Sequence, residues 1–331
     1  MTDQGQIQPI DVSVDLGEDK AVQASHLTKR FTDTLAVDDL TFTVPMGSIF
    51  GFIGPSGCGK TTTIRLLIGY YRPTSGNVWV LGREPSDFDR EIKSHIGYMP
   101  QDFVLYPHLT MQQNLRFASS IYGQGSSNQR MQDKLLHLFD LYEHRKKRVT
   151  QISGGMRRRL ALAATLLHNP TLLFLDEPTA GIDPVLRENL WDYFRTLRRQ
   201  GSTLFVTTQY VGEAAYCDLV AVMRAGKLLM VDTPEGLRRR ALKGEVLDVQ
   251  LSHRIDSQTE HQLAGLKGIL SLRRIHATAY EVITEDASIA IPILMRWFEA
   301  QQIGVQSIDE TQLPFDDVFV KLMEESRAEN G

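Results

Sequence analysis

The feature that most constrains this 331-residue sequence is a glycine-rich segment that follows an apolar run and precedes a helical pattern. Residues 48–53 are predicted to form a buried strand, and residues 62–68 have the apolar spacing of a helix. The segment between them fits the pattern G-x-x-x-x-G-K-[ST] at every position; its residues are Gly54, Pro55, Ser56, Gly57, Cys58, Gly59, Lys60 and Thr61. Because glycines let successive backbone N–H groups turn toward one anion, the sequence predicts a phosphate-binding loop.

The end of this loop carries the chemistry needed to bind a nucleotide and its metal ion. Lys60 provides a point charge for the β- and γ-phosphates, and the hydroxyl of Thr61 is suited to Mg²⁺. The N-terminus of the following helix, where Thr62 lies, adds a favourable dipole. A chance match in a glycine-rich turn is the alternative, and the predicted strand and helix on either side argue against it. We therefore expect ATP to bind along residues 54–62, with Mg²⁺ as cofactor.

A second buried strand ends in two acidic residues. The apolar run at 172–175 is followed directly by Asp176 and Glu177. Ligands of open α/β sheets lie beyond the carboxyl ends of the strands, which places Asp176 near Lys60 and Thr61. We expect Asp176 to coordinate Mg²⁺ through water, and Glu177 to orient and polarise the attacking water. The alternative, two acids that only begin a loop, would be favoured without the phosphate loop.

A segment ahead of this strand resembles the signature of a known family. Ser153, Gly154, Gly155 and Met156 open a predicted helix where the ABC (ATP-binding cassette) ATPases have the sequence LSGGQ. Serine is a favourable N-cap for such a helix. Three consecutive arginines, beginning at Arg157, oppose the helix dipole unless an anion lies in front of the helix. The resemblance implies that this anion is the γ-phosphate of ATP held by the opposite subunit of a dimer.

Three further positions resemble motifs of the same family. Gln101 matches the Q-loop residue, which the resemblance places at Mg²⁺ and the attacking water, with its loop against a membrane partner. Asp183 matches the D-loop, which crosses the dimer interface in the family. Phe31 stands near the family's aromatic that stacks on adenine, although an aromatic beside a strand is also common in packing. The resemblance covers about residues 22–231, with its motifs in order.

The order of elements predicts the fold class. Alternating strands and helices indicate an α/β fold with a mainly parallel sheet. The resemblance implies a P-loop NTPase of the ABC cassette type, with an antiparallel sub-sheet and a helical subdomain at about residues 87–168. From Gly244, the pattern strand, helix, strand, strand, helix, strand predicts a small α+β ferredoxin-like module over 244–331. Residues 1–20 are predicted to be a disordered leader, which leaves residues 21–243 to the ATPase domain.

Two positions depart from the family pattern. Met156 stands where glutamine is usual, and drug- and lipid-export members are similar in this respect. Gln209 stands where the family has its switch histidine, after the predicted strand at 203–207. A neutral amide is a weaker donor to a phosphate than a charged imidazole. With Lys60, Glu177 and Gln209 as the candidate catalytic residues, we expect hydrolysis to persist at a reduced or adapted rate. Compensation by another group and a mainly regulatory site stay open.

Composition limits the partners of the chain. There are 36 Lys and Arg residues against 40 Asp and Glu residues, a net charge of −4, so no nucleic-acid partner is expected. Cys58 and Cys217 provide neither a disulfide framework nor a metal-ligand spacing. The sequence lacks an apolar stretch of the roughly 18–20 residues that span a bilayer, so we expect a separate chain to span it.

These observations predict an ATP-binding and ATP-hydrolysing subunit of an ABC transporter, at the cytoplasmic face of the membrane. The resemblance implies a homodimer or heterodimer of such subunits, working with a separate polytopic permease. The ending at residues 313–322 resembles the L-E-D-V-F close of exporter ATPases, which favours export. An importer ATPase, and a soluble ABC ATPase that acts on ribosomes or DNA, are the alternatives. The permease selects the transported substrate.

Overall fold

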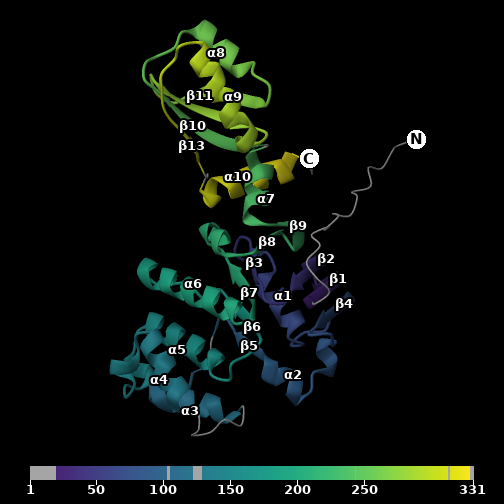
Figure 1. Cartoon of the computed structure of the whole chain (residues 1–331). Coiled ribbons are helices and arrows are strands. Elements are labelled where there is room, and N and C mark those ends of the chain that lie inside the picture. The colour runs from purple at the N-terminus through teal and green to yellow at the C-terminus, as the bar shows by residue number, and fades with distance from the viewer. Residues whose placement is uncertain (1–19, 103–104, 122–128, 243, 312–313, 329–331) are drawn as a thin grey trace, which may run out of the picture. The chain divides into compact units, whose positions relative to one another are not determined.

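The structure is a computed structural model that describes residues 20–102, 105–121, 129–242, 244–311 and 314–328. The predicted leader, apart from Lys20, and the first residue of the exporter-like ending, Leu313, lie outside the described residues. The chain divides into two compact units, one ending at Val231 and the other beginning at Asp232 (Figure 1). Among the described residues, the first unit has two sheets and the second unit has one, and each unit has its own hydrophobic core.

A six-stranded sheet forms the centre of the first unit. Its strand order is β5-β6-β7-β3-β8-β9, and the pairs from β5 through β8 are parallel. β3, β6 and β7 are buried at every residue, as expected of a parallel sheet covered on both faces. The strands are β3 (Ile49–Ile53), β5 (Ile96–Met99), β6 (Leu172–Asp176), β7 (Thr203–Thr208), β8 (Leu219–Arg224) and β9 (Lys227–Asp232).

A second, antiparallel sheet packs on the first through aromatic side chains. Its order is β2-β1-β4, from β1 (Lys20–Phe31), β2 (Thr34–Pro45) and β4 (Ser75–Val80). Phe42 on β2 contacts Phe50 on β3 with ring centroids 5.8 Å apart, and Phe205 on β7 stacks on Phe50 at 5.5 Å. These rings are shielded from water, so the apolar surface they bury holds the two sheets together.

Helices cover the faces and one side of the parallel sheet. α1 follows the phosphate loop and contacts β2, β4 and β6, while α6 packs on β3 and β7. α3, α4 and α5 contact one another and form one group in Figure 1, the predicted helical subdomain. The helices of this unit are α1 (Lys60–Leu67), α2 (Arg90–His95), α3 (Met111–Ile121), α4 (Gln129–Leu138), α5 (Gly154–Leu166) and α6 (Pro184–Arg199), with 3-10 turns η1 (Pro85–Asp87), η3 (Tyr142–His144), η4 (Val149–Gln151) and η5 (Val211–Tyr216).

The second unit has the ferredoxin-like arrangement that the sequence predicted. Its antiparallel sheet has the order β11-β12-β10-β13, and α8 and α9 supply Leu263, Leu294 and Phe298 to the core on one face. Its elements are α7 (Pro234–Leu242), β10 (Glu245–Leu251), α8 (Ser257–Ala264), β11 (Ile269–Arg274), β12 (Ala279–Thr284), α9 (Ala287–Ala300), β13 (Val305–Glu310) and α10 (Phe315–Ala328).

The division between the units falls before α7, whereas the change of sequence pattern placed it near Gly244. α7 contacts α10 at the other end of the second unit, and the guanidinium of Arg238 lies 4.1 Å from the ring centroid of Phe315. This contact assigns α7 to the second unit. Among the described residues, no helix is long and apolar enough to cross a bilayer.

Candidate functional site

The candidate site lies where β3, β6 and β7 end side by side. Ile53, the last residue of β3, pairs with Thr208 on β7, and Asp176 on β6 pairs with Thr207. A pocket of about 340 Å³ opens beside the phosphate loop. Its lining residues come from the loop and the start of α1, from the start of β2 and from three other segments: Thr34, Leu35, Ala36, Ser56, Gly57, Gly59, Lys60, Thr61, Thr62, Gln101, Glu177, Ala225 and Gly226.

Two glycines of the loop have no room for a side chain. A Cβ at Gly54 would lie 2.3 Å from the carbonyl oxygen of Met223, and one at Gly59 would lie 2.4 Å from that of Ala36. Gly59 also has a φ of +114°, which side-chain-bearing residues rarely adopt. Close packing on neighbouring backbone therefore fixes the path of the loop. Cys58 is buried within this turn, and burial raises the pKa of its thiol.

Lys60, the first residue of α1, is almost fully buried. Its Nζ donates hydrogen bonds to the carbonyl oxygens of Gly54, at 2.8 Å, and Pro55, at 3.1 Å. Nζ also lies 3.6 Å from Oε1 of Glu177, with both side chains about nine-tenths buried or more. The lysine expected to bind phosphate is thus held at the site by the loop's own carbonyl groups.

The carboxylate of Asp176 is suited to a metal ion. Thr207 donates to its Oδ1 at 2.6 Å, and Oδ2 is buried without a hydrogen-bond partner. A buried charged oxygen is costly unless a partner neutralises it, so the orphaned Oδ2 fits a cation or a metal-bound water. No cluster of three or more His, Cys, Asp or Glu side chains suited to a metal exists in the described part of the chain. One carboxylate with a hydroxyl, as at Asp176 and Thr61, is the sparse ligand set that Mg²⁺ accepts.

Both the backbone and the side chain of Glu177 are held by hydrogen bonds or close contacts. Its backbone N–H donates to the carbonyl oxygen and the hydroxyl of Thr207, at 3.1 Å and 3.0 Å. Its Oε2 accepts from Nε2 of Gln101 at 3.4 Å, and its Oε1 faces Lys60. Its φ is +52°, an uncommon conformation for a residue with a side chain, so the surrounding contacts must maintain it. The carboxylate is therefore fixed at the wall of the pocket.

The other residues predicted for the site lie at helix starts or outside the lining of the pocket. Asp183 caps α6 by accepting from the N–H of Leu186, and Ser153 caps α5 as predicted, by accepting from the N–H of Met156. The signature residues are not among the lining residues of the pocket, and neither is Phe31, whose ring packs edge-on against Tyr71 at 5.1 Å. Gln209 is exposed directly after β7. The structure thus brings Lys60, Thr61, Gln101 and Glu177 together around one pocket, and places Asp176 beside Glu177.

Three contributions to the site were not predicted from the sequence. The hydroxyl of Thr207 bridges Asp176 and Glu177, residues 34–36 form part of the pocket wall, and Arg158 bonds to the backbone of Glu177. The role of Thr207 could have been inferred from the sequence. A polar residue at the end of a buried strand needs a hydrogen-bond partner, and the neighbouring strand ends in acidic residues. The other two depend on tertiary packing.

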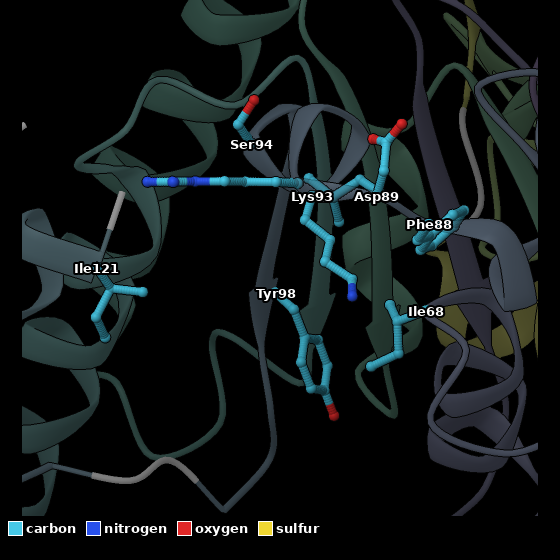
Figure 2. A pocket seen from close by; sticks show the side chains of 9 residues that line it. Ile68, Phe88, Asp89, Lys93, Ser94, Tyr98 and Ile121 are labelled. Atoms are coloured by element: carbon cyan, nitrogen blue, oxygen red, sulfur yellow. The ribbon is translucent and has the colours of Figure 1, made fainter. Parts of the chain in front are cut away.

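A larger groove of about 610 Å³ lies in the same unit, between α2, β5 and the end of α3. Figure 2 shows Ile121 across the groove from Tyr98, Phe88 and Ile68, with Lys93 between them. The walls combine apolar side chains with the charged groups of Asp89, Arg90 and Lys93. The apolar side chain of Ile121, the last residue of α3, is 60% exposed at the rim of this groove.

Known proteins are similar to this chain in sequence and in fold. The family model "ABC transporter" matches residues 37–180. "Probable multidrug ABC transporter ATP-binding protein YbhF" of Escherichia coli (strain K12) is 37% identical over 249 residues, covering 73% of this chain and 43% of that protein. "Daunorubicin resistance ATP-binding protein DrrA3" of Streptomyces coeruleorubidus is 34% identical over 305 residues, covering 92% of each. "Nod factor export ATP-binding protein I" of Burkholderia orbicola (strain AU 1054) is 34% identical, covering 68% of this chain and 74% of that protein.

A solved "Structure of ATP binding subunit of ABC transporter" is similar to this chain in fold, with a TM-score of 0.62 and 27% identity. It covers 66% of this chain, and 92% of that chain is matched. The chain spans less than half the length of the YbhF relative. It belongs to the family of ABC transporter ATP-binding proteins, and this membership implies an ATP-hydrolysing domain. The family and the fold class predicted from the sequence are confirmed.

The bridge formed by Thr207 predicts a stability difference between two neighbouring threonines. Thr207→Val keeps the volume but removes the donor to Asp176 and one of the two acceptors of the Glu177 N–H, which keeps the carbonyl oxygen of residue 207. Hydrogen bonds to charged groups contribute about 1.5–3 kcal/mol. The hydroxyl of Thr208, on the same strand, accepts from the neutral N–H of Tyr210, so Thr208→Val should cost about 1 kcal/mol. Urea denaturation measures both free energies of unfolding. Equal losses would show that the charge of Asp176 adds nothing to this bond.

Proposed function

We propose that this chain binds and hydrolyses ATP in the phosphate-loop pocket, and that hydrolysis powers export through a separate membrane permease. The observation that carries the proposal is the carboxylate of Glu177, which lies at the pocket within reach of Lys60 and Gln101. The motif order and the family membership support the same conclusion.

In this proposal, the phosphate chain of ATP lies along residues 54–62. The backbone N–H groups of the loop and the N-terminus of α1 bind the phosphate oxygens, and Lys60 exchanges its carbonyl partners for the β- and γ-phosphates. Asp176, Thr61 and Gln101 hold Mg²⁺, directly or through water. When bound, Mg²⁺ neutralises negative charge that develops on the phosphate oxygens. Phe31 packs near the adenine.

Glu177 acts on the attacking water. Its carboxylate accepts a hydrogen bond from the water and takes a proton from it as the water oxygen attacks the γ-phosphorus. The bond between the γ-phosphorus and the oxygen that bridges it to the β-phosphate breaks, and ADP leaves. Gln209 donates from its side-chain amide to the γ-phosphate, in place of a histidine, and this neutral donor limits the rate. Positioning and electrostatics suffice for this reaction, so no covalent enzyme intermediate forms.

The signature residues act on the nucleotide of a second subunit. In a head-to-tail dimer of two copies of this chain, or of this chain and a related one, Ser153, Gly154, Gly155 and Met156 contact the γ-phosphate across the interface. Asp183 lies at that interface. ATP binds the closed dimer better than the open one, so hydrolysis lets the dimer open.

The groove between α2, β5 and α3 is the proposed docking surface for the permease. It is apolar at Ile68, Phe88 and Ile121, and its charged residues offer polar contacts at the rim. β5 leads from the groove directly to Gln101, so a shift of Gln101 reaches the docked permease through one short segment. In this proposal the subunit works at the cytoplasmic face of a membrane.

Export is the direction favoured by the relatives, whose names refer to multidrug transport, daunorubicin resistance and Nod factor export. Met156 and the ending around Phe315 support the same direction. We assign ATP hydrolysis to the first unit and an accessory role to the second, ferredoxin-like unit.

Replacing the proposed general base gives the sharpest test of hydrolysis. Glu177→Gln should bind ATP with an affinity within about threefold of the parent protein while hydrolysis falls by about 100-fold or more, because general bases contribute 10²–10⁴-fold. Steady-state ATPase assays and equilibrium binding of a fluorescent ATP analogue measure the two effects. The matched control is Glu188→Gln, an exposed change on α6 that should leave both unchanged. Normal turnover in Glu177→Gln would remove Glu177 as the base.

The glutamine at position 209, directly after β7, leads us to expect a gain of activity when it is replaced by histidine. Gln209→His should raise the ATPase rate several-fold, about 3- to 10-fold, because a charged donor forms a hydrogen bond roughly twice as strong as a neutral one. The rate should rise without a change in ATP affinity. Gln200→His, an exposed substitution at the end of α6, is the control. An unchanged rate in Gln209→His would show that the amide does not limit turnover.

Docking on the groove is tested by co-purification from gently solubilised native membranes. The parent chain should bring with it one polytopic membrane protein at comparable stoichiometry. Ile121→Glu places a charge on the apolar wall and should reduce that recovery by about 10-fold, with ATP binding retained. Ile289→Glu, at a comparably exposed isoleucine of α9, is the control. Ribosomal or DNA-repair components without a membrane protein would contradict the transporter proposal.

A further inference from the structure

Three consecutive arginines on α5 reach backbone carbonyl oxygens in three different parts of the first unit. Arg157 donates to Ile152 at 3.4 Å, next to its own helix, and Arg159 donates to Phe139 at 2.9 Å, after α4. Arg158 crosses from the helical subdomain to the parallel sheet and donates to Glu177 at 2.6 Å. Of these three bonds, the one made by Arg158 is the shortest and ends at the proposed catalytic carboxylate residue.

The backbone of Glu177 needs such a contact. Its φ is +52°, and the following residue is Pro178, whose ring restricts the residue before it. Two donors meet at its carbonyl oxygen, the guanidinium of Arg158 and, at 3.3 Å, the N–H of Ala180. The stronger, charge-assisted bond comes from Arg158. Holding the carbonyl fixes the peptide plane and, with it, the direction in which the side chain of Glu177 leaves the backbone.

The environment of Arg158 is unusual for a residue that serves only packing. The side chain is half-buried, and its Nε is shielded from water without a hydrogen-bond partner. Burial lowers the pKa of the guanidinium, while the nearby carboxylates of Glu177 and Asp176 oppose that effect. The positive charge of Arg158 therefore lies close to both acids of the proposed site.

We propose that Arg158 is a positioning residue for hydrolysis: its guanidinium holds the backbone of Glu177 so that the carboxylate faces Lys60 and Gln101. Arg158 lies about one turn beyond Ser153 on α5, so the helix that begins at the signature also holds Glu177 of the same chain. In the proposed dimer, contact between the signature and the partner's ATP is thereby linked to the geometry of this chain's own site. The inference rests on the proposed role of Glu177.

The test compares Arg158→Met with Arg159→Met. Both remove a guanidinium of α5 that donates to a carbonyl oxygen, but only Arg158 contacts Glu177. Arg158→Met should lower kcat by about 10- to 100-fold, because a displacement of about 1 Å of a reacting group has an effect of this size. The KM for ATP should stay within about twofold, and Arg159→Met should retain the parent kcat. Arg158→Lys, which keeps a charged donor, should recover part of the lost kcat.

A double variant separates positioning from general damage to the fold. If Arg158 acts through Glu177, adding Arg158→Met to Glu177→Gln should cause no further loss in single-turnover hydrolysis. A parent-like kcat in Arg158→Met, an equal loss in Arg159→Met, or a further loss in the double variant would each overturn the inference. Arg158→Gln replaces the methionine variant in all these assays if the latter does not fold. Normal turnover in Glu177→Gln would instead contradict the proposed role of Glu177 itself.

Discussion

Backbone pairing aligns Asp176 with Thr207 across β6 and β7, and Ile53 with Thr208 across β7 and β3. This register is the constraint on which the site depends, because it brings the phosphate loop, the two acids and the residue after β7 to one edge of the sheet. A shift of one residue would turn the hydroxyl of Thr207 to the opposite face and leave the Asp176 carboxylate without a donor. Buried apolar side chains along all three strands, and the phenylalanines that pack on them, hold this register.

Much of the fold could be predicted because its strongest sequence patterns are local. The runs that became β3, β6 and β7 are short, apolar and bounded by turns, and the alternation after residue 244 matched the ferredoxin-like elements closely. The strands β4, β5, β8 and β9 were not predicted. β5 has only four residues, and β9 is half-buried along most of its length, so neither gives a clear pattern. The boundary at Asp232 was missed because contact between α7 and α10 joins segments about 80 residues apart.

The site shows the same division between local pattern and tertiary contact. Lys60, Thr61, Asp176 and Glu177 follow from motifs whose spacing fixes their place at strand ends. The contacts of the three arginines after the signature could not be predicted in this way. Because their charge opposes the helix dipole, the sequence suggested an anion in front of α5. In the structure they bond to carbonyl oxygens at Ile152, Phe139 and Glu177, destinations that depend on how α5 packs. The predicted contacts of Phe31, Gln209 and the signature with nucleotide remain predictions.

In the proposed site, the contacts of Lys60 within the chain bear on the release of phosphate as well as on its binding. The ammonium group has two carbonyl acceptors and a nearby carboxylate, so a bound phosphate would replace existing partners rather than meet an unpartnered charge. The net gain from this lysine is the difference between two sets of interactions, which is smaller than either. When a phosphate leaves, the same carbonyl groups are at hand to receive the ammonium group again. These contacts therefore lower the affinity of the loop for phosphate. They also provide the ammonium group with hydrogen-bond partners both before a phosphate binds and after it leaves.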